Sequence, residues 1–223
     1  MTRTASFSDL RRPHKFLRAA TLAMVLSAPA VPATAATIVN GSFEQATTAP
    51  FTSQTRLETG STALTGWTVT SGNIDLVSTY WRASNGSRSV DLNGSGPGTI
   101  ATTILGMIVG RMYTVMFDMA ANPDTAPNAK VVRVASGLDS ATFSRPRNGS
   151  TRAAMNWATM IFTTSATATS QLLTFRSMTT SGAGAAIDNV RIALVPVPLP
   201  ATAPLALTGL AALALLRRRK PTA

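Results

Sequence analysis

The sequence predicts an all-β protein whose central part is a single two-sheet sandwich or jelly roll. Across residues 37–195, apolar residues alternate with polar ones, and almost no helical spacing is present. Clusters of Gly, Pro, Asn and Asp separate these short runs, as expected between strands. The apolar fraction of 45% is enough for a packed core. A central part of about 155 residues has the ordinary size of one such domain.

Nine short runs are typical of strands. About nine or ten strands at this spacing predict two packed sheets. In 113–119, for example, the odd-numbered residues share one apolar face. In chain order the runs are 67–69, 74–77, 89–92, 99–105, 113–119, 130–134, 157–163, 171–175 and 186–192. Asn-Gly dipeptides tolerate positive φ and so predict turns at Asn40, Asn85, Asn93 and Asn148.

Residues 1–36 are typical of a secretory signal peptide. A basic start is followed by the apolar stretch 19–28 and by Ala33-Thr-Ala35, a small-residue cleavage signal. Ten apolar residues are too few to cross a bilayer permanently. A buried helix is the weaker interpretation, because Pro29 and Pro32 would end it.

Removal of the signal peptide would also remove His14, the single histidine of the chain. The sequence contains no cysteine. The mature protein would therefore have neither imidazole nor thiol groups, which excludes His-containing catalytic triads, Cys–His pairs and metal sites built from those ligands.

Residues 195–223 are predicted to form a second terminal signal. A proline-rich stretch precedes an apolar run at 204–216, and basic residues occupy 217–220. A helix over 204–216 would be about 20 Å long, against roughly 30 Å for the hydrocarbon core. We expect this short hydrophobic helix to enter a membrane transiently, with its basic end in the cytoplasm. A small-residue site before such a tail is typical of an anchor that is later cut; a lone stop-transfer helix is the alternative.

The motif before this run resembles the VPLPA variant of the PEP-CTERM sorting signal, and it consists of Val197, Pro198, Leu199, Pro200 and Ala201. The resemblance implies export through the secretion machinery of a Gram-negative bacterium that makes extracellular polysaccharide. It also implies processing by an exosortase-like enzyme. The protein would be tethered transiently to the inner membrane and would then lie at the cell surface or in the extracellular matrix.

Short motifs of the central part resemble, in their order, those of DUF642-related choice-of-anchor C domains. They are Asn40-Gly-Ser-Phe-Glu44, Gly66-Trp67, 74–77 with Tyr80-Trp81, 86–94, 97–100, 113–118 and Ile187-Asp-Asn-Val190. The resemblance implies a galactose-binding-like jelly roll over 37–194 that acts as a carbohydrate-binding or cell-surface module without catalysis.

The basic charge of the chain lies mostly at its two ends. The formal net charge is +11, but residues 37–195 hold eleven basic and eight acidic residues, a net of +3. A nucleic-acid partner requires a basic face on the folded part, so we expect none.

Tyr80, Trp81 and Arg82 form the predicted carbohydrate site. Sugars present apolar C–H faces and a ring of hydroxyls, so they bind aromatic side chains that stand beside planar polar groups. The three residues follow a predicted strand and precede a predicted turn. The alternative is that Tyr80 or Trp81 plugs one end of the sandwich; Trp67 and Trp157 are expected in the core.

One structural Ca²⁺ is predicted between Glu44 and Asp188. Only oxygen ligands remain in the mature protein, and these favour a hard cation. The resemblance to carbohydrate-binding jelly rolls implies one acidic ligand near the first strand and another on the last strand. Glu44 and Asp188 occupy matching places. The alternative is that Glu44 is a solvated turn residue and that Asp188 caps a turn.

We expect no enzymatic activity. A glycosidase would use two carboxylates about 5–9 Å apart, and Asp118 and Asp124 flank one loop, but nothing in the sequence selects that pair. Two functions remain, a carbohydrate-binding module and a structural matrix or adhesion protein without sugar binding. The first requires an exposed aromatic side chain beside polar groups. The second predicts that Tyr80 and Trp81 are buried and that a broad apolar or edge-strand surface is exposed.

Overall fold

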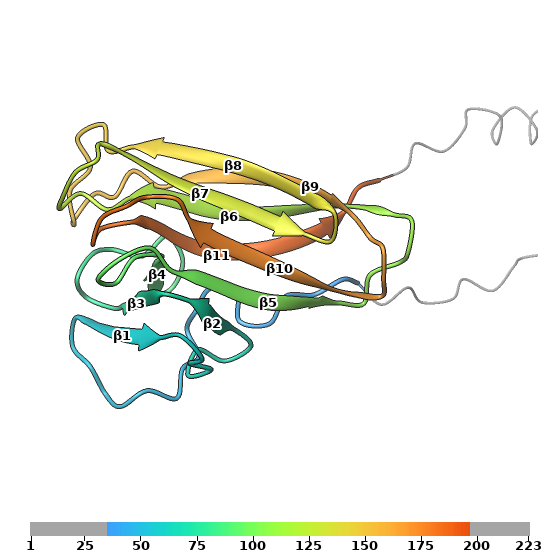
Figure 1. Cartoon of the computed structure of the whole chain (residues 1–223), viewed down its shortest axis with the longest axis horizontal. Coiled ribbons are helices and arrows are strands. Elements are labelled where there is room, and N and C mark those ends of the chain that lie inside the picture. The colour runs from blue at the N-terminus through green and yellow to red at the C-terminus, as the bar shows by residue number, and fades with distance from the viewer. Residues whose placement is uncertain (1–34, 197–223) are drawn as a thin grey trace, which may run out of the picture. The chain divides into compact units, whose positions relative to one another are not determined.

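The computed structural model describes residues 35–196, which form an all-β sandwich of two antiparallel sheets (Figure 1). The predicted fold class, a single jelly-roll sandwich, is confirmed. Residues 1–34 of the predicted signal peptide, the motif 197–201, the apolar run 204–216 and the basic tail lie outside the described residues. Within 35–196 no helix is long and apolar enough to cross a membrane.

The two sheets contain six and five strands. The six-stranded sheet has the order β1-β3-β4-β11-β6-β9, and the five-stranded sheet has the order β2-β5-β10-β7-β8. The strands are β1 (Gln54–Glu58), β2 (Thr68–Ser71), β3 (Asn73–Val77), β4 (Ser89–Asp91), β5 (Thr99–Leu105), β6 (Met112–Ala121), β7 (Ala129–Ser136), β8 (Asp139–Pro146), β9 (Ala158–Ser165), β10 (Ser170–Ser177) and β11 (Ala185–Leu194).

The chain crosses between the sheets at most of its connections. Only the β3–β4 and β7–β8 connections join neighbours within one sheet. At the sides of the sandwich the edge strands of the two sheets meet, β8 against β9 and β1 against β2. These contacts partly cover strand edges that would otherwise be open to pairing with another chain.

All nine predicted runs correspond to strands, but β1 and β8 were not predicted. Both are edge strands whose residues are mostly polar. In β1 only Leu57 is fully buried, and in β8 every residue retains some exposure. A strand that buries little apolar surface carries little alternation, so the pattern that reveals the other nine is weak in these two.

Aromatic side chains fill the space between the sheets. Phe117 of β6 meets Phe175 of β10 edge-on at a centroid distance of 5.0 Å, and Phe143 of β8 at 5.2 Å. Trp67, which precedes β2, is buried and lies 5.1 Å from Phe43. The prediction that Trp67 belongs to the core is confirmed. Such tilted and edge-on contacts suit the quadrupoles of the rings.

A second apolar cluster covers the outer face of the six-stranded sheet, the face that points away from the five-stranded sheet. The connections β3–β4 (78–88) and β8–β9 (147–157) fold over this face. The cluster, which we call the outer cluster, contains Val77, Trp81, Ala120, Met155 and Ala186, with Tyr80 and Trp157 packed against it. Trp157 is therefore only half-buried on the outer face, and the prediction that it lies in the main core is wrong.

Candidate functional site

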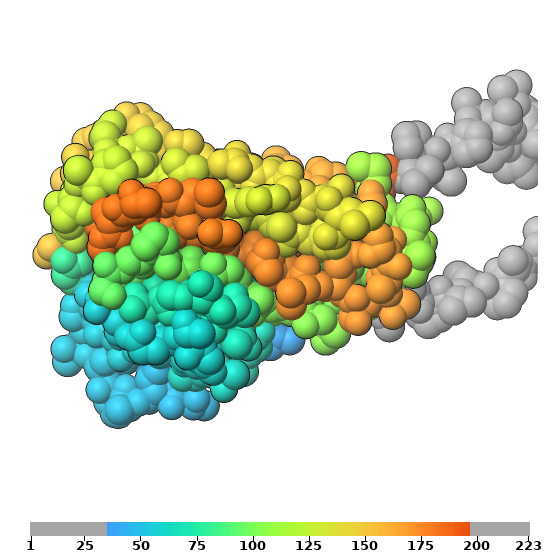
Figure 2. All heavy atoms as spheres, viewed as in Figure 1, coloured from blue at the N-terminus to red at the C-terminus, as the bar shows by residue number. Residues whose placement is uncertain are grey.

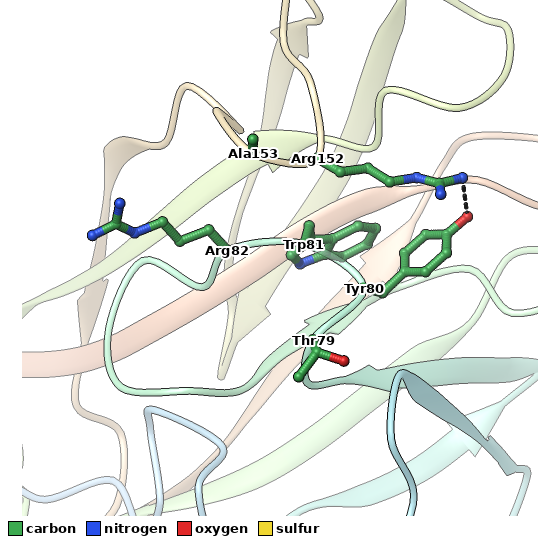
Figure 3. Close-up of a pocket in the computed structure, with 6 residues that line it drawn as sticks. All are labelled: Thr79, Tyr80, Trp81, Arg82, Arg152 and Ala153. Atoms are coloured by element: carbon green, nitrogen blue, oxygen red, sulfur yellow. Dashed lines mark hydrogen bonds between the residues drawn. The ribbon is translucent and has the colours of Figure 1, made fainter.

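An open hollow of about 530 Å³ lies where these two connections meet. Arg82 N donates a hydrogen bond to Arg152 O at 3.0 Å, and Trp157 Nε1 donates to Arg82 O at 3.0 Å, so the connections are joined to each other. The hollow is lined by Thr79, Tyr80, Trp81, Arg82, Arg152 and Ala153 (Figure 3). The structure thus brings all three residues of the predicted carbohydrate site into one hollow.

One wall of the hollow is a cluster of Tyr80, Arg152 and Asp124. The Arg152 guanidinium lies 4.0 Å from the centroid of the Tyr80 ring. Arg152 Nε donates to Asp124 Oδ1 at 2.9 Å, and the Tyr80 hydroxyl donates to Asp124 Oδ2 at 2.8 Å. Arg152 Nη2 also donates to the Tyr80 hydroxyl. The cluster therefore places a fixed aromatic ring beside a planar cation and a carboxylate.

The groups of this cluster shift each other's pKa values. Burial raises the pKa of the Tyr80 hydroxyl, and the Asp124 carboxylate raises it further. The hydrogen bond to Asp124 raises the pKa of Arg152. Near neutral pH the wall therefore presents a neutral phenol and a charged guanidinium. The guanidinium can donate hydrogen bonds to the hydroxyls of a ligand, and the phenol oxygen can accept one from them.

Trp81 differs from the platform that the sequence suggested. It is 4% exposed, and its Nε1 donates to the buried hydroxyl of Ser89 at 2.8 Å. Its ring packs in the outer cluster and lies 5.7 Å from the ring of Tyr80. Trp81 therefore forms the floor of the hollow and supports Tyr80, and little of its ring can contact a ligand.

Arg82 and Tyr80 retain more access to solvent than Trp81. Arg82 is exposed, and Tyr80 is half-buried. In Figure 3 the Arg152 side chain extends toward Tyr80, while the Arg82 side chain extends in the opposite direction. A ligand in the hollow could therefore meet a guanidinium on either side of the Trp81 floor.

Glu44 and Asp188 both hold the β3–β4 connection. Glu44 Oε1 accepts hydrogen bonds from the backbone N–H groups of Ser87 and Arg88, each at 2.8 Å. Asp188 Oδ2 accepts from Asn85 N at 2.7 Å. The connection that carries Tyr80, Trp81 and Arg82 is therefore pinned at its far end by two carboxylates.

These contacts bear on the predicted calcium ion. The described partners of Glu44 and Asp188 are N–H and O–H donors, which are typical of carboxylates that hold a loop. Among residues 35–196 no group of three or more acidic or histidine side chains gathers as a metal site. A Ca²⁺ shared by Glu44 and Asp188 stays a prediction.

Four aspartates lie on the outer face of the six-stranded sheet, and two of them, Asp118 and Asp188, are direct cross-strand partners. Burial raises the pKa of Asp188 to about 7. Burial also acts on Asp118, but hydrogen bonds from Asn189, Ser84 and Thr159 outweigh it and lower the pKa of Asp118. The other two, Asp75 and Asp91, are likewise direct cross-strand partners.

A carboxylate pair with divergent pKa values can serve acid–base catalysis. Here, however, Asp118 and Asp188 are both buried and hydrogen-bonded beneath Ser84 and Asn85. A substrate would have to displace the β3–β4 connection to reach them. Asp124, which the sequence placed beside Asp118, instead faces Tyr80 and Arg152. The geometry therefore favours binding over catalysis.

Arg152 and Asp124 were not predicted as residues of the carbohydrate site. Arg152 lies 70 residues from Arg82 in the sequence, in a stretch without a recognisable motif. Only the folding of the β8–β9 connection over the outer face brings it to Tyr80. In the sequence Asp124 was considered only with Asp118, as one of two carboxylates that flank a loop, and no local pattern indicates its partner 44 positions away.

Residues 36–193 match the family model described as "Protein of unknown function (DUF642)". Halomucin of Haloquadratum walsbyi is 35% identical over 172 residues, which is 75% of this chain. The chain spans about 2% of the length of that relative.

Solved structures of carbohydrate-binding modules show distant similarity. A family 35 module from an environmental isolate has a TM-score of 0.40 and 17% identity, over 52% of this chain and 82% of the module. TmCBM61, solved with β-1,4-galactotriose, has a TM-score of 0.42 and 14% identity. The match covers 70% of this chain and 97% of TmCBM61. The CBM22-1 xylan-binding domain of Paenibacillus barcinonensis Xyn10C has a TM-score of 0.40 and 16% identity. The match covers 65% of this chain and 94% of that domain.

Proposed function

The chain belongs to the DUF642 family, and from that premise we propose that it is a non-catalytic carbohydrate-binding module of the cell surface or extracellular matrix. The observation that carries this proposal is the hollow lined by Tyr80, Arg82 and Arg152. The partner would be an extracellular polysaccharide.

The chemistry of the hollow suits a sugar. The C–H face of a pyranose can pack on the accessible part of the Tyr80 ring. Its hydroxyls can accept hydrogen bonds from Arg82 and Arg152 and donate to Asp124. Because Arg152 and Asp124 already hold Tyr80 by hydrogen bonds, little side-chain freedom is lost when a ligand binds.

A glycan array followed by titration calorimetry tests the proposal. The mature chain is expected to bind a subset of polysaccharides. Replacing Tyr80 by Ala or Arg82 by Ala should weaken binding at least tenfold, because each change removes a direct contact. Arg133→Ala is the matched control, since Arg133 is an exposed arginine on the five-stranded sheet, and binding should be unchanged.

Trp81→Ala is a poor probe of the same site. The substitution would open a cavity in the outer cluster and would destabilise the fold by about 3–5 kcal/mol. Loss of binding in that variant would therefore not separate contact from support. Absence of binding by the unaltered chain across the array, or equal affinities for Tyr80→Ala and the unaltered chain, would contradict the proposal.

Export and sorting are part of the same proposal. The predicted signal peptide would direct the chain out of the cytoplasm of a Gram-negative bacterium, and an exosortase-type enzyme would act at 197–201. Residues 204–216 would hold the chain in the inner membrane until that step. This part depends on sequence patterns at the two ends of the chain.

A structural matrix or adhesion protein without sugar binding is the second candidate. The burial of Trp81 favours it, because that hypothesis requires the tryptophan to be covered. It would also bring other proteins to exposed strand edges or apolar surface. A chain that binds no glycan but co-purifies with matrix proteins after cross-linking would support this candidate over the first.

A further inference from the structure

Three connections gather at one end of the sandwich, which we call the apolar end. They are the β5–β6 connection (106–111), the β7–β8 turn (137–138) and the β9–β10 connection (166–169) (Figure 1). Gly110 N donates to Ala166 O at 2.8 Å. Ser165 N donates to the Asp139 carboxylate at 2.7 Å, which ties the β7–β8 turn to the same group. The β5–β6 and β9–β10 connections both reach the surface at this end (Figure 2).

This end exposes large apolar side chains. Six of them, with exposed fractions from 40% to 93%, are Leu105, Ile108, Val109, Met112, Leu138 and Leu194. Leu138, at the tip of the β7–β8 turn, is the most exposed of these. The Asp139 carboxylate beside it is already engaged by Thr164 Oγ1 and Ser165 N. Exposed apolar side chains gathered in this way mark a surface that contacts a membrane or another protein.

The described chain also enters and leaves at the apolar end. Thr37 N donates to Leu105 O at 2.9 Å, and Val195 N donates to Met112 O at 2.9 Å. From Pro196 the chain has only eight residues to Pro204, where the predicted membrane segment begins. Fully extended, these residues span about 28 Å. The ten residues of β6 alone span about 33 Å, so the tether is no longer than the sandwich.

Once residues 204–216 are inserted, the short tether keeps the apolar end within about 28 Å of the bilayer. The connection that follows β6 lies a full strand length, about 33 Å, further from the attachment point. We propose that the apolar end rests on the membrane surface, with Ile108, Val109 and Leu138 in the interfacial layer. The inference rests on the proposed insertion of 204–216, but not on sugar binding.

Interfacial contact of this kind is chemically reasonable. The transfer of apolar side chains at loop tips from water to the boundary between headgroups and acyl chains is favourable. This contact is a second attachment to the membrane, besides the tail. It orients the sandwich with its apolar end toward the bilayer and the opposite end away from it. The hollow, which lies among the connections at 78–88 and 147–157, would then be held away from the bilayer.

Site-specific fluorescence tests the proposal. The chain has no cysteine, so single-cysteine variants can be labelled uniquely. Val109→Cys, Leu138→Cys and the control Thr125→Cys, which lies beyond the opposite end of β6, would each carry the dye NBD. The exported chain, with its tail intact, is reconstituted into phosphatidylethanolamine–phosphatidylglycerol vesicles that contain shallow doxyl-labelled lipid.

Quenching at positions 109 and 138 is expected to exceed that at 125 at least threefold. Equal quenching at all three positions, in chains that float with the vesicles, would overturn the proposal while leaving export and sugar binding intact. Failure of the chain to float would overturn it together with insertion of the tail. A blue shift at 109 that grows with protein concentration without lipid would instead assign the apolar end to self-association and would also overturn it.

Discussion

The Asp91 carboxyl group is fully buried on the outer face of the six-stranded sheet. Its oxygens accept hydrogen bonds from Asn122 Nδ2 at 2.7 Å and from the backbone N–H groups of Asn93 and Gly184. Burial nevertheless dominates and raises the pKa of Asp91 to about 7, with Asp75 adding to the effect. The folded state therefore keeps a proton on Asp91 under conditions in which the unfolded chain has released it.

This difference predicts a pH dependence of stability. Between the unfolded value of 3.8 and about 7, the folded state binds more protons than the unfolded state, so the free energy of unfolding falls as the pH rises. Asp188, whose pKa burial also raises to about 7, acts in the same direction. Asp91→Asn should remove roughly half of the decrease in the free energy of unfolding between pH 5 and pH 8, as measured by urea unfolding.

The exposed residue Thr103 supplies the control for this experiment. Thr103→Ser changes no titratable group, so the slope of stability against pH should be the same as in the unaltered chain. A slope that is the same in Asp91→Asn as in the unaltered chain would show that Asp91 does not hold the proton.

At this scale the sequence predicts some residues well and others not at all. The Asn-Gly turn interpretation is confirmed where Asn40 and Asn148 adopt positive φ and where Gly86 does so after Asn85. At Asn93 the chain also reverses, with bends at 94–96 closed by a bridge between Asn93 and Pro97, but positive φ is found at neither Asn93 nor Gly94. Asn93 is instead fully buried and donates through Nδ2 to Thr179 O and Ser181 O. Dipeptide chemistry cannot distinguish an exposed turn from a buried asparagine whose partners lie far along the chain.

Among the elements, the β3–β4 connection is the one on which the candidate site depends. Glu44→Ala would remove the acceptor of two backbone N–H groups and of the Ser87 hydroxyl. We expect amide hydrogen exchange at 85–88 to become at least tenfold faster, and stability to fall by about 1–3 kcal/mol. Hydrogen-exchange mass spectrometry measures the first effect.

The same measurement examines the predicted calcium ion. If Glu44 and Asp188 share a Ca²⁺, adding calcium to the unaltered chain should slow exchange at 85–88 relative to chelator. Identical exchange in both conditions would remove the calcium prediction. Exchange that stays slow in Glu44→Ala would show that other contacts hold the connection.

The elements themselves were predictable wherever one face of a strand is buried. Nine strands have that property, and β1 and β8 have it only weakly, as their position at the sheet edges explains. The packing of the 78–88 and 147–157 connections over the outer face was not predictable. It depends on contacts between Trp81, Met155 and Trp157 that no local periodicity encodes.

For the whole molecule, the proposed route out of the cell predicts the mass of the mature protein. Mass spectrometry of the chain from its native host should show a start near residue 36 or 37. It should also show loss of the basic residues 217–220, because an anchor that is cut does not retain its cytoplasmic end. A surface form that still carries 217–220 would contradict processing, and one that still begins at Met1 would contradict export.

The hollow is assembled from two segments that are remote in sequence, and this has a consequence for how relatives can diverge. Neither 78–88 nor 147–157 contributes a strand to the two ladders. Substitutions at exposed positions of either segment, such as Arg82 and Ala153, leave the hydrogen-bond registers of the sheets intact, provided that the buried Trp81 and Met155 are retained. Under the proposed function, glycan selectivity would therefore change step by step in one segment while the other is kept, as in an antibody whose hypervariable loops vary on a constant framework.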